Sequence, residues 1–140
     1  MKKLIVILIV AIFTCPAFTQ DFSDSEQMKS QPYMIHAEKA NCDSMDGNNA
    51  EHKICLNLEF QEKDSIMNTH FLDYVKKIEN DTVKNSILEY QKVWVTNRRI
   101  ESSLEAEGYS GHMLSIAYIS TMIFITDKRI EELKYLIEYN

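Results

Sequence analysis

One helical face constrains this chain more than any other feature of its sequence. In the stretch 91–98, Gln91, Trp94 and Arg98 are spaced at i, i+3 and i+7, so a helix places an amide, an indole and a guanidinium on one side. A large aromatic ring and an arginine on the inner side of a helix need apolar neighbours and carboxylate or carbonyl acceptors. The stretch therefore predicts a core helix whose packing partners carry acids, with Trp94 in the centre of the core.

The first 19 residues predict a signal peptide. Lys2 and Lys3 precede the apolar run 4–13, and Pro16 precedes a small-residue pattern that suggests cleavage near Gln20. The run is shorter than the roughly 20 residues that a transmembrane helix needs. We therefore expect a periplasmic or secreted protein.

A lipoprotein is the alternative interpretation of the N-terminal region. Residues 12–15 loosely resemble a lipobox, in which Cys15 would be acylated after cleavage and would anchor the chain to a membrane. Pro16 follows the cysteine directly, and Phe13 and Thr14 are bulky for this motif. Membrane attachment is therefore expected only if Cys15 is lipidated.

The remaining chain has the length and charge of one acidic domain. About 120 residues are enough for a single hydrophobic core. The full sequence has 15 basic and 21 acidic side chains and a net charge of -6, which becomes -8 if Lys2 and Lys3 are removed with the signal peptide. An acidic surface disfavours nucleic acid and anionic membranes and speeds the encounter with a basic protein.

Three segments follow the predicted signal peptide. Residues 20–40 are polar, contain Pro32 and show no sustained period, so we expect a flexible or loosely docked N-terminal arm. Residues 41–49 have turn chemistry. Residues 41–140 as a whole are expected to form one helical domain.

Apolar residues recur at steps of three and four, with Leu104 at the end of one such period, which predicts an all-α fold with these residues facing inward. Asn80 and Asp81 offer an N-cap, and Gly108 and Gly111 end a helix. These signals predict a small bundle of about three long helices, over residues 51–78, 82–106 and 112–139. The β-branched residues of 123–126 also fit a strand, but the helical period continues beyond them.

Two cysteines remain in this domain. An isolated pair in an exported protein most often forms a disulfide, so Cys42 and Cys55 are expected to be bridged. Closing so short a loop would stabilise the fold by about 3 kcal/mol. The alternative is a zinc site that adds His52, one helical turn from Cys55, to the two cysteines.

The sequence contains none of the usual catalytic constellations. It lacks a serine or cysteine nucleophile motif and a glycine-rich phosphate loop, and its four histidines are scattered. We therefore predict a protein that is not an enzyme and that has no cofactor and no metal. A hydrolase would require a deep pocket with acids of perturbed pKa.

Several polar residues occupy predicted inward positions of the three helices. A network between helices would pair Asp64 with Arg98 or Arg129 and fix the helix register, since a buried unpaired arginine is prohibitive. The alternative is that these groups line a ligand groove. The set consists of Asp64, Asn68, Gln91, Trp94, Arg98, Thr126 and Arg129.

The order and spacing of these residues resemble a known family. Between residues 41 and 137, the chain is similar to the LprI-type lysozyme inhibitors, which are exported bacterial proteins. The resemblance rests on Cys42, Cys55, the segment 64–68 with Phe71, Gln91, Trp94, Arg98, Gly111, Thr126, Arg129 and Leu133. It implies a small disulfide-containing helical domain that binds and inhibits lysozyme.

The chain departs from the family pattern at two places. Ser102 and Thr121 stand where family members usually carry a second cysteine pair, and Ser110–Gly111 stands where they carry paired glycines. The partner implied by the resemblance is a basic lysozyme, which we expect to contact Tyr109, Ser110 and His112 in an exposed loop. The alternative is a periplasmic interaction or structural protein without inhibitor activity.

Overall fold

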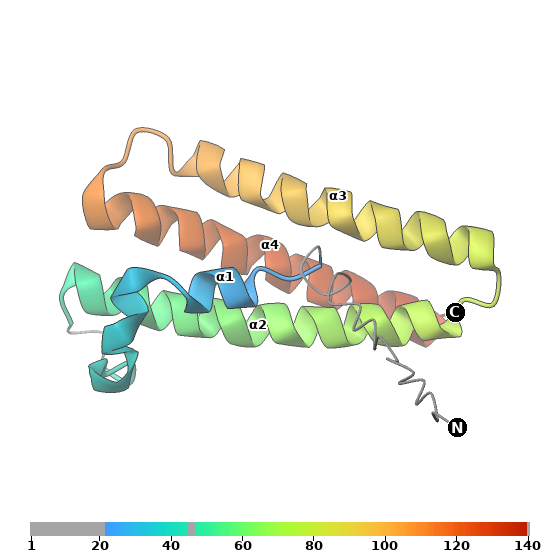
Figure 1. Ribbon diagram of the computed structural model, residues 1–140, viewed down its shortest axis with the longest axis horizontal. Coiled ribbons are helices and arrows are strands. Elements are labelled where there is room, and N and C mark those ends of the chain that lie inside the picture. Colours follow the sequence, from blue (N-terminus) through green and yellow to red (C-terminus); the bar gives the residue numbers. More distant parts are fainter. Residues whose placement is uncertain (1–21, 45–46, 140) are drawn as a thin grey trace, which may run out of the picture.

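The computed structural model describes residues 22–44 and 47–139 and shows an all-α fold (Figure 1). A short helix α1 (Ser25–Lys29) and a 3-10 helix η1 (Pro32–Lys39) precede three long helices, α2 (Asn49–Lys77), α3 (Asp81–Glu105) and α4 (Gly111–Tyr139). The predicted fold class and number of long helices are confirmed. Residues 123–126 lie within α4, so the strand alternative is wrong. The predicted signal peptide and Cys15 lie outside the described residues.

Asparagine side chains set the starts of two long helices. The Oδ1 atom of Asn48 accepts hydrogen bonds from the backbone N–H groups of Ala50 and Glu51. Asn80 caps α3 in the same way, as the sequence suggested. These contacts satisfy N–H groups that have no partner inside the helix.

Two glycines make the turn between α3 and α4. Gly108 has φ +91° and Gly111 has φ +59°, a left-handed conformation that other residues rarely adopt. The chain therefore reverses direction within the few residues that separate the two helices, and α4 runs back along α3 (Figure 1).

Helix α4 is the centre of the bundle. It packs along α2 over much of its length, and α3 contacts α4 far more than it contacts α2. In Figure 1, α3 lies on one side of α4, whereas α1 lies along α2. Among the described residues, no helix is long and apolar enough to cross a membrane.

The apolar core is divided into two clusters. The first contains Phe22, Met67, Phe71, Ile130 and Leu133. The second contains Met28, Phe60, Ile119, Met122 and Ile123. Each cluster contains residues of the N-terminal segment, α2 and α4. Between the two clusters, the buried positions of these segments are polar: Asp24, Asp64, Thr126 and Arg129.

The N-terminal arm is packed more firmly than the sequence predicted. Residues 20–40 were expected to be flexible or loosely docked, but Phe22, Asp24 and Met28 are buried and α1 packs on α2. Asn57 of α2 also attaches the N-terminal segment to the bundle, because its Nδ2 donates to the backbone oxygen of Met28 and to the Tyr33 hydroxyl. Residues 22–33 are therefore an integral part of the fold.

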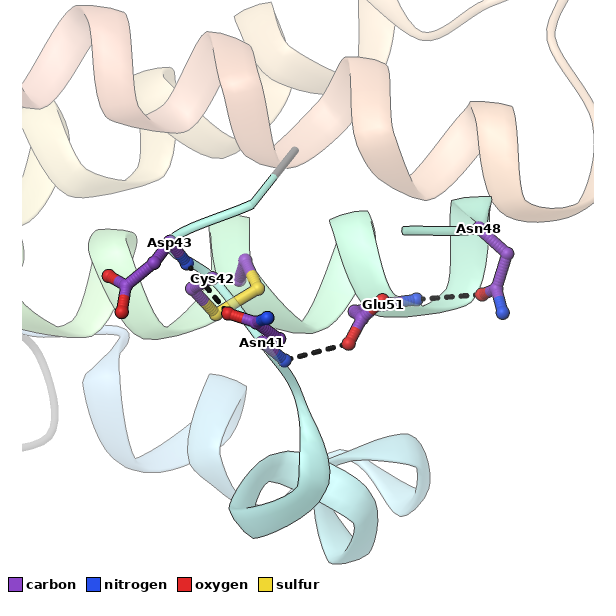
Figure 2. Close-up of a disulfide and its surroundings, with 6 residues drawn as sticks. Asn41, Cys42, Asp43, Asn48 and Glu51 are labelled. Carbon is purple, nitrogen blue, oxygen red and sulfur yellow. Dashed lines mark hydrogen bonds between the residues drawn. A yellow bond between two sulfur atoms is a disulfide. The ribbon is translucent and has the colours of Figure 1, made fainter. Parts of the chain in front are cut away.

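The predicted disulfide between Cys42 and Cys55 is confirmed. It attaches the segment after η1 to the first turns of α2, and Figure 2 shows Glu51 reaching from α2 to the backbone N–H of Asn41, at 2.7 Å. Both sulfurs are consumed by the bond, so the zinc alternative with His52 is wrong. Within the described part of the chain, no group of three potential metal ligands occurs.

Reduction of the disulfide tests its contribution to stability. Opening the loop, or the double substitution Cys42→Ser and Cys55→Ser, should lower the free energy of unfolding by about 3 kcal/mol because the unfolded chain gains conformational freedom. Urea unfolding with and without reductant measures this change. The double-serine variant is the control, since it should show no further response to reductant; an unchanged wild-type midpoint would contradict the expectation.

Candidate functional site

A buried arginine joins four segments between the two apolar clusters. Arg98 of α3 donates from Nη1 to Asp64 Oδ1 of α2 at 2.7 Å and to Thr126 Oγ1 of α4 at 2.8 Å. Its Nη2 donates to Asp24 Oδ2 of the N-terminal segment at 2.7 Å. Both ends of the guanidinium are thus paired with carboxylates in a site where Arg98 is 1% exposed.

The second oxygen of Asp64 fixes the start of α1. Asp64 Oδ2 accepts hydrogen bonds from the Ser23 hydroxyl at 2.7 Å, the Asp24 backbone N–H at 2.8 Å and the Ser25 backbone N–H at 3.1 Å. A carboxylate at the N-terminus of a helix is favourable, because the unpaired N–H groups there carry partial positive charge. Asp64 therefore holds both Arg98 and the N-terminal segment.

Arg99 supplies a second cation to this layer. Its Nε donates to Asp24 Oδ1 at 2.7 Å, and this hydrogen bond raises the pKa of the Arg99 guanidinium. Two arginines thus face two buried acids, which balances the charge. Buried pairs of this kind contribute little net stability compared with apolar packing, but removing one partner is strongly destabilising.

A second polar contact links α3 and α4 directly. Gln91 Oε1 accepts hydrogen bonds from Arg129 Nη2 at 2.8 Å and from Arg129 Nε at 3.2 Å. Arg129 Nη1 also pairs with Glu132 at 2.6 Å. The network suggested by the sequence thus divides into two groups, one around Arg98 and one around Arg129.

Trp94 and Asn68 were expected to join the interior network, but their surroundings differ from that prediction. Trp94 is only partly buried and packs at the edge of the first apolar cluster, with the guanidinium carbons of Arg98 and Arg129 at 5.0 Å and 5.6 Å from its ring. The interpretation of Trp94 as the centre of the core is therefore wrong. The Oδ1 atom of Asn68 is buried and has no hydrogen-bond partner among the described residues.

The innermost groups of the network are shielded from solvent. Asp64, Gln91 and Thr126 have no exposed surface, and their polar contacts are made within the protein. We therefore regard the network as structural. The sequence did not indicate the roles of Ser23, Asp24 and Ser25. Asp24 precedes α1, but its side chain makes no cap hydrogen bond, because its carboxylate pairs with Arg98 and Arg99.

Hydroxyl residues occupy the two positions at which the resemblance implied a second cysteine pair. Ser102 is fully buried, and its Oγ has no hydrogen-bond partner among the described residues. Thr121 is partly buried and donates to the backbone oxygen of Ala117 at 3.0 Å. The C-terminal part of α3 is thus held without a disulfide.

The three residues expected to contact a partner are exposed at the turn between α3 and α4. Tyr109 is 52% exposed, and Ser110 and His112 are also exposed. Tyr109 lines an open groove of about 800 Å³ between the end of α3 and the start of α4, together with Leu104 and Tyr118. The turn therefore offers an accessible surface, in contrast to the closed network.

The fold, the disulfide and the buried charge layer define a small disulfide-containing helical domain. The family model described as lysozyme inhibitor LprI matches residues 40–133. The chain belongs to the LprI lysozyme inhibitor family, and the resemblance seen in the sequence is confirmed. No curated protein and no solved structure matches the chain. Asp24 lies before the matched range, so one acid of the buried layer comes from outside the family domain.

Substitution of Arg98 tests the buried layer. Arg98→Met should lower the free energy of unfolding by about 3–5 kcal/mol, because Asp64 is left buried without its cation. Urea unfolding measures the change, and Lys134→Met, an exposed position on α4, is the control with an effect within about 0.5 kcal/mol. A loss of only a few tenths for Arg98→Met would show that the arginine is exposed to water.

Alkaline titration tests the packing beside the groove. Burial raises the pKa of Tyr118, and the negative charge of Asp24 adds to this effect; burial also raises the pKa of Tyr33. Because both phenols bind their protons more tightly in the folded state, stability should be lost as pH rises above about 10. Ultraviolet absorbance should show two late-ionising groups among the seven tyrosines.

Two variants separate the contributions to this titration. Tyr118→Phe should remove one late-ionising group, whereas Tyr139→Phe at the end of α4 should leave both in place. An unchanged late phase in Tyr118→Phe would contradict the burial of this phenol.

Proposed function

We propose that this protein is exported to the cell envelope and that it binds and inhibits a lysozyme there. Membership of the LprI lysozyme inhibitor family is the observation that carries this proposal. The described fold agrees with a binding role, since its buried ionisable groups, Asp24, Asp64, Arg98 and Arg129, are used in ion pairs and hydrogen bonds inside the protein.

The charge of the chain supports a basic partner. The net charge is -6 for the full sequence, which favours a partner of opposite charge. Opposite charges accelerate the encounter of two proteins, and salt screens this attraction. An acidic inhibitor would therefore associate fastest with its target at low ionic strength.

Contact with the target is proposed at the turn between α3 and α4. Tyr109, Ser110 and His112 are exposed there, and α3 and α4 hold the turn at both ends. Inhibition requires that these side chains enter the substrate cleft of lysozyme, where carboxylates carry out the hydrolysis of the glycosidic bond. A turn on two long helices is a rigid platform for this purpose.

Export is proposed on two grounds. The N-terminal sequence has the pattern of a signal peptide, and the Cys42–Cys55 disulfide is of a kind that persists in oxidising compartments. Acylation of Cys15 is the alternative route to the cell envelope. Intact-mass measurement of the exported protein would distinguish cleavage near Gln20 from lipidation at Cys15.

An inhibition assay tests the proposed function. The purified protein, without residues 1–19, should slow the lysis of a bacterial cell-wall suspension by egg-white lysozyme at micromolar excess, and the effect should weaken as salt is raised. Tyr109→Ala combined with His112→Ala should relieve the inhibition, whereas Tyr135→Ala at an exposed position of α4 should not. Full lysozyme activity at all inhibitor concentrations and low salt would overturn the proposal for that lysozyme.

A further inference from the structure

Large apolar side chains are exposed where the C-terminal half of α3 faces α4. Ile100 and Leu104 of α3 are 53% and 64% exposed, and Leu114 and Phe124 of α4 are 44% and 58% exposed. Leu104 lines two neighbouring grooves, one with Ile100 and Leu114 and the other with Phe124. We call these four residues the Leu104 surface.

The buried layer explains why α3 exposes these residues. Its inward positions are Gln91, Val95, Arg98 and Ser102, three of which are polar. The inner side of α3 is therefore attached through hydrogen bonds and ion pairs, and the apolar residues of its last turns are left on the outer side. Contiguous exposed apolar side chains on a folded domain mark interaction sites more often than single ones do.

Three carboxylates border the Leu104 surface. Glu101 and Glu105 line the groove that contains Phe124, and Glu107 lines the groove that contains Leu114. None of the three forms an ion pair with a described residue, and all are exposed.

The position of these acids is unfavourable for the isolated protein. Glu101 and Glu105 lie at the C-terminal end of α3 and Glu107 follows it closely. The partial negative charge of the helix end disfavours carboxylates, and the last turn of α3 has no basic residue. Among the residues that the structure describes, Arg99 is the one cation that lines either groove, and its guanidinium is held by Asp24. Exposed apolar groups and uncompensated acids thus occur at the same place. A partner with both apolar and basic side chains would cover the apolar groups and neutralise the acids.

We propose that the Leu104 surface is the docking site for a protein segment that presents an apolar side chain flanked by lysine or arginine. The apolar group lies in the grooves on either side of Leu104, and the cations face Glu101, Glu105 and Glu107. This proposal rests on the proposed function, in which the segment belongs to lysozyme. Docking at the Leu104 surface then places the neighbouring turn, with Tyr109, at the substrate cleft of lysozyme. An acidic partner is disfavoured by charge, and a second copy of this acidic chain is disfavoured for the same reason.

The charge contribution is tested with two matched triple variants. Each replaces three exposed glutamates that form no ion pair with a described residue, so both change the net charge equally. Binding to egg-white lysozyme is measured by calorimetry, separately from lysozyme activity, at low and high salt. The test variant is Glu101→Gln, Glu105→Gln, Glu107→Gln, and the control is Glu79→Gln, Glu131→Gln, Glu138→Gln.

The test variant should bind roughly 10-fold more weakly at low salt and should lose most of the salt dependence. The control should change the affinity by no more than about 2-fold. Equal weakening in both would show that only the overall charge matters and would overturn the assignment of the docking site.

The apolar contribution is tested by Leu104→Ser, with Leu72→Ser on α2 as the matched control at an exposed leucine. Leu104→Ser should weaken binding by at least about 5-fold, and Leu72→Ser should not. Circular dichroism melting of both variants verifies that they are folded. Unchanged binding of a folded Leu104→Ser variant overturns the proposal, as does a wild-type dimer in gel filtration that Leu104→Ser abolishes.

The two measurements separate this inference from the proposed function. Binding without inhibition, sensitive to Leu104→Ser, would overturn the inhibitor function and support the docking site. Inhibition that both test variants leave unchanged would support the function and overturn the docking site. The absence of any binding by the wild-type protein would overturn both.

Discussion

The charged contacts of Arg98 determine how the rest of the molecule is arranged. A guanidinium that is shielded from water needs acids on both sides, and these come from Asp64 in α2 and Asp24 in the N-terminal segment. Asp64 in turn caps α1, so the short segment before the family domain is attached by the same side chain that pairs with Arg98. The interior is consequently organised as an apolar cluster on each side of a charged layer.

Much of this arrangement could be predicted from residue spacing. The helical period placed the ends of all three long helices within two residues of those observed, because caps and glycines stand at the boundaries. The pairing of Arg98 with Asp64 follows from the cost of burying a charge. Asp24 could not be found in this way, because it lies 74 residues from Arg98 and in a polar segment whose sequence alone resembles a flexible arm.

Two errors have one physical origin. Trp94 was placed in the centre of the core because large aromatic residues are usually buried, yet its ring lies at the edge beside two guanidinium groups. Leu104 fits the helical period, but it faces outward. A periodic pattern indicates that a helix has two different sides; it does not say which side faces inward when the inner side is mainly polar. The candidate docking surface therefore became visible only in the three-dimensional arrangement.

The polar inner side of α3 has a consequence for how proteins of this architecture can change. Because Gln91, Arg98 and Ser102 occupy the interior, the residues on the outer side of α3 contribute little to holding the helix in place. Substitutions at Ile100 or Leu104 should cost little folding free energy, as is usual for exposed positions. Stability and surface chemistry are thus assigned to opposite sides of one helix, and a library that randomises only the outer side would vary the surface while retaining the fold.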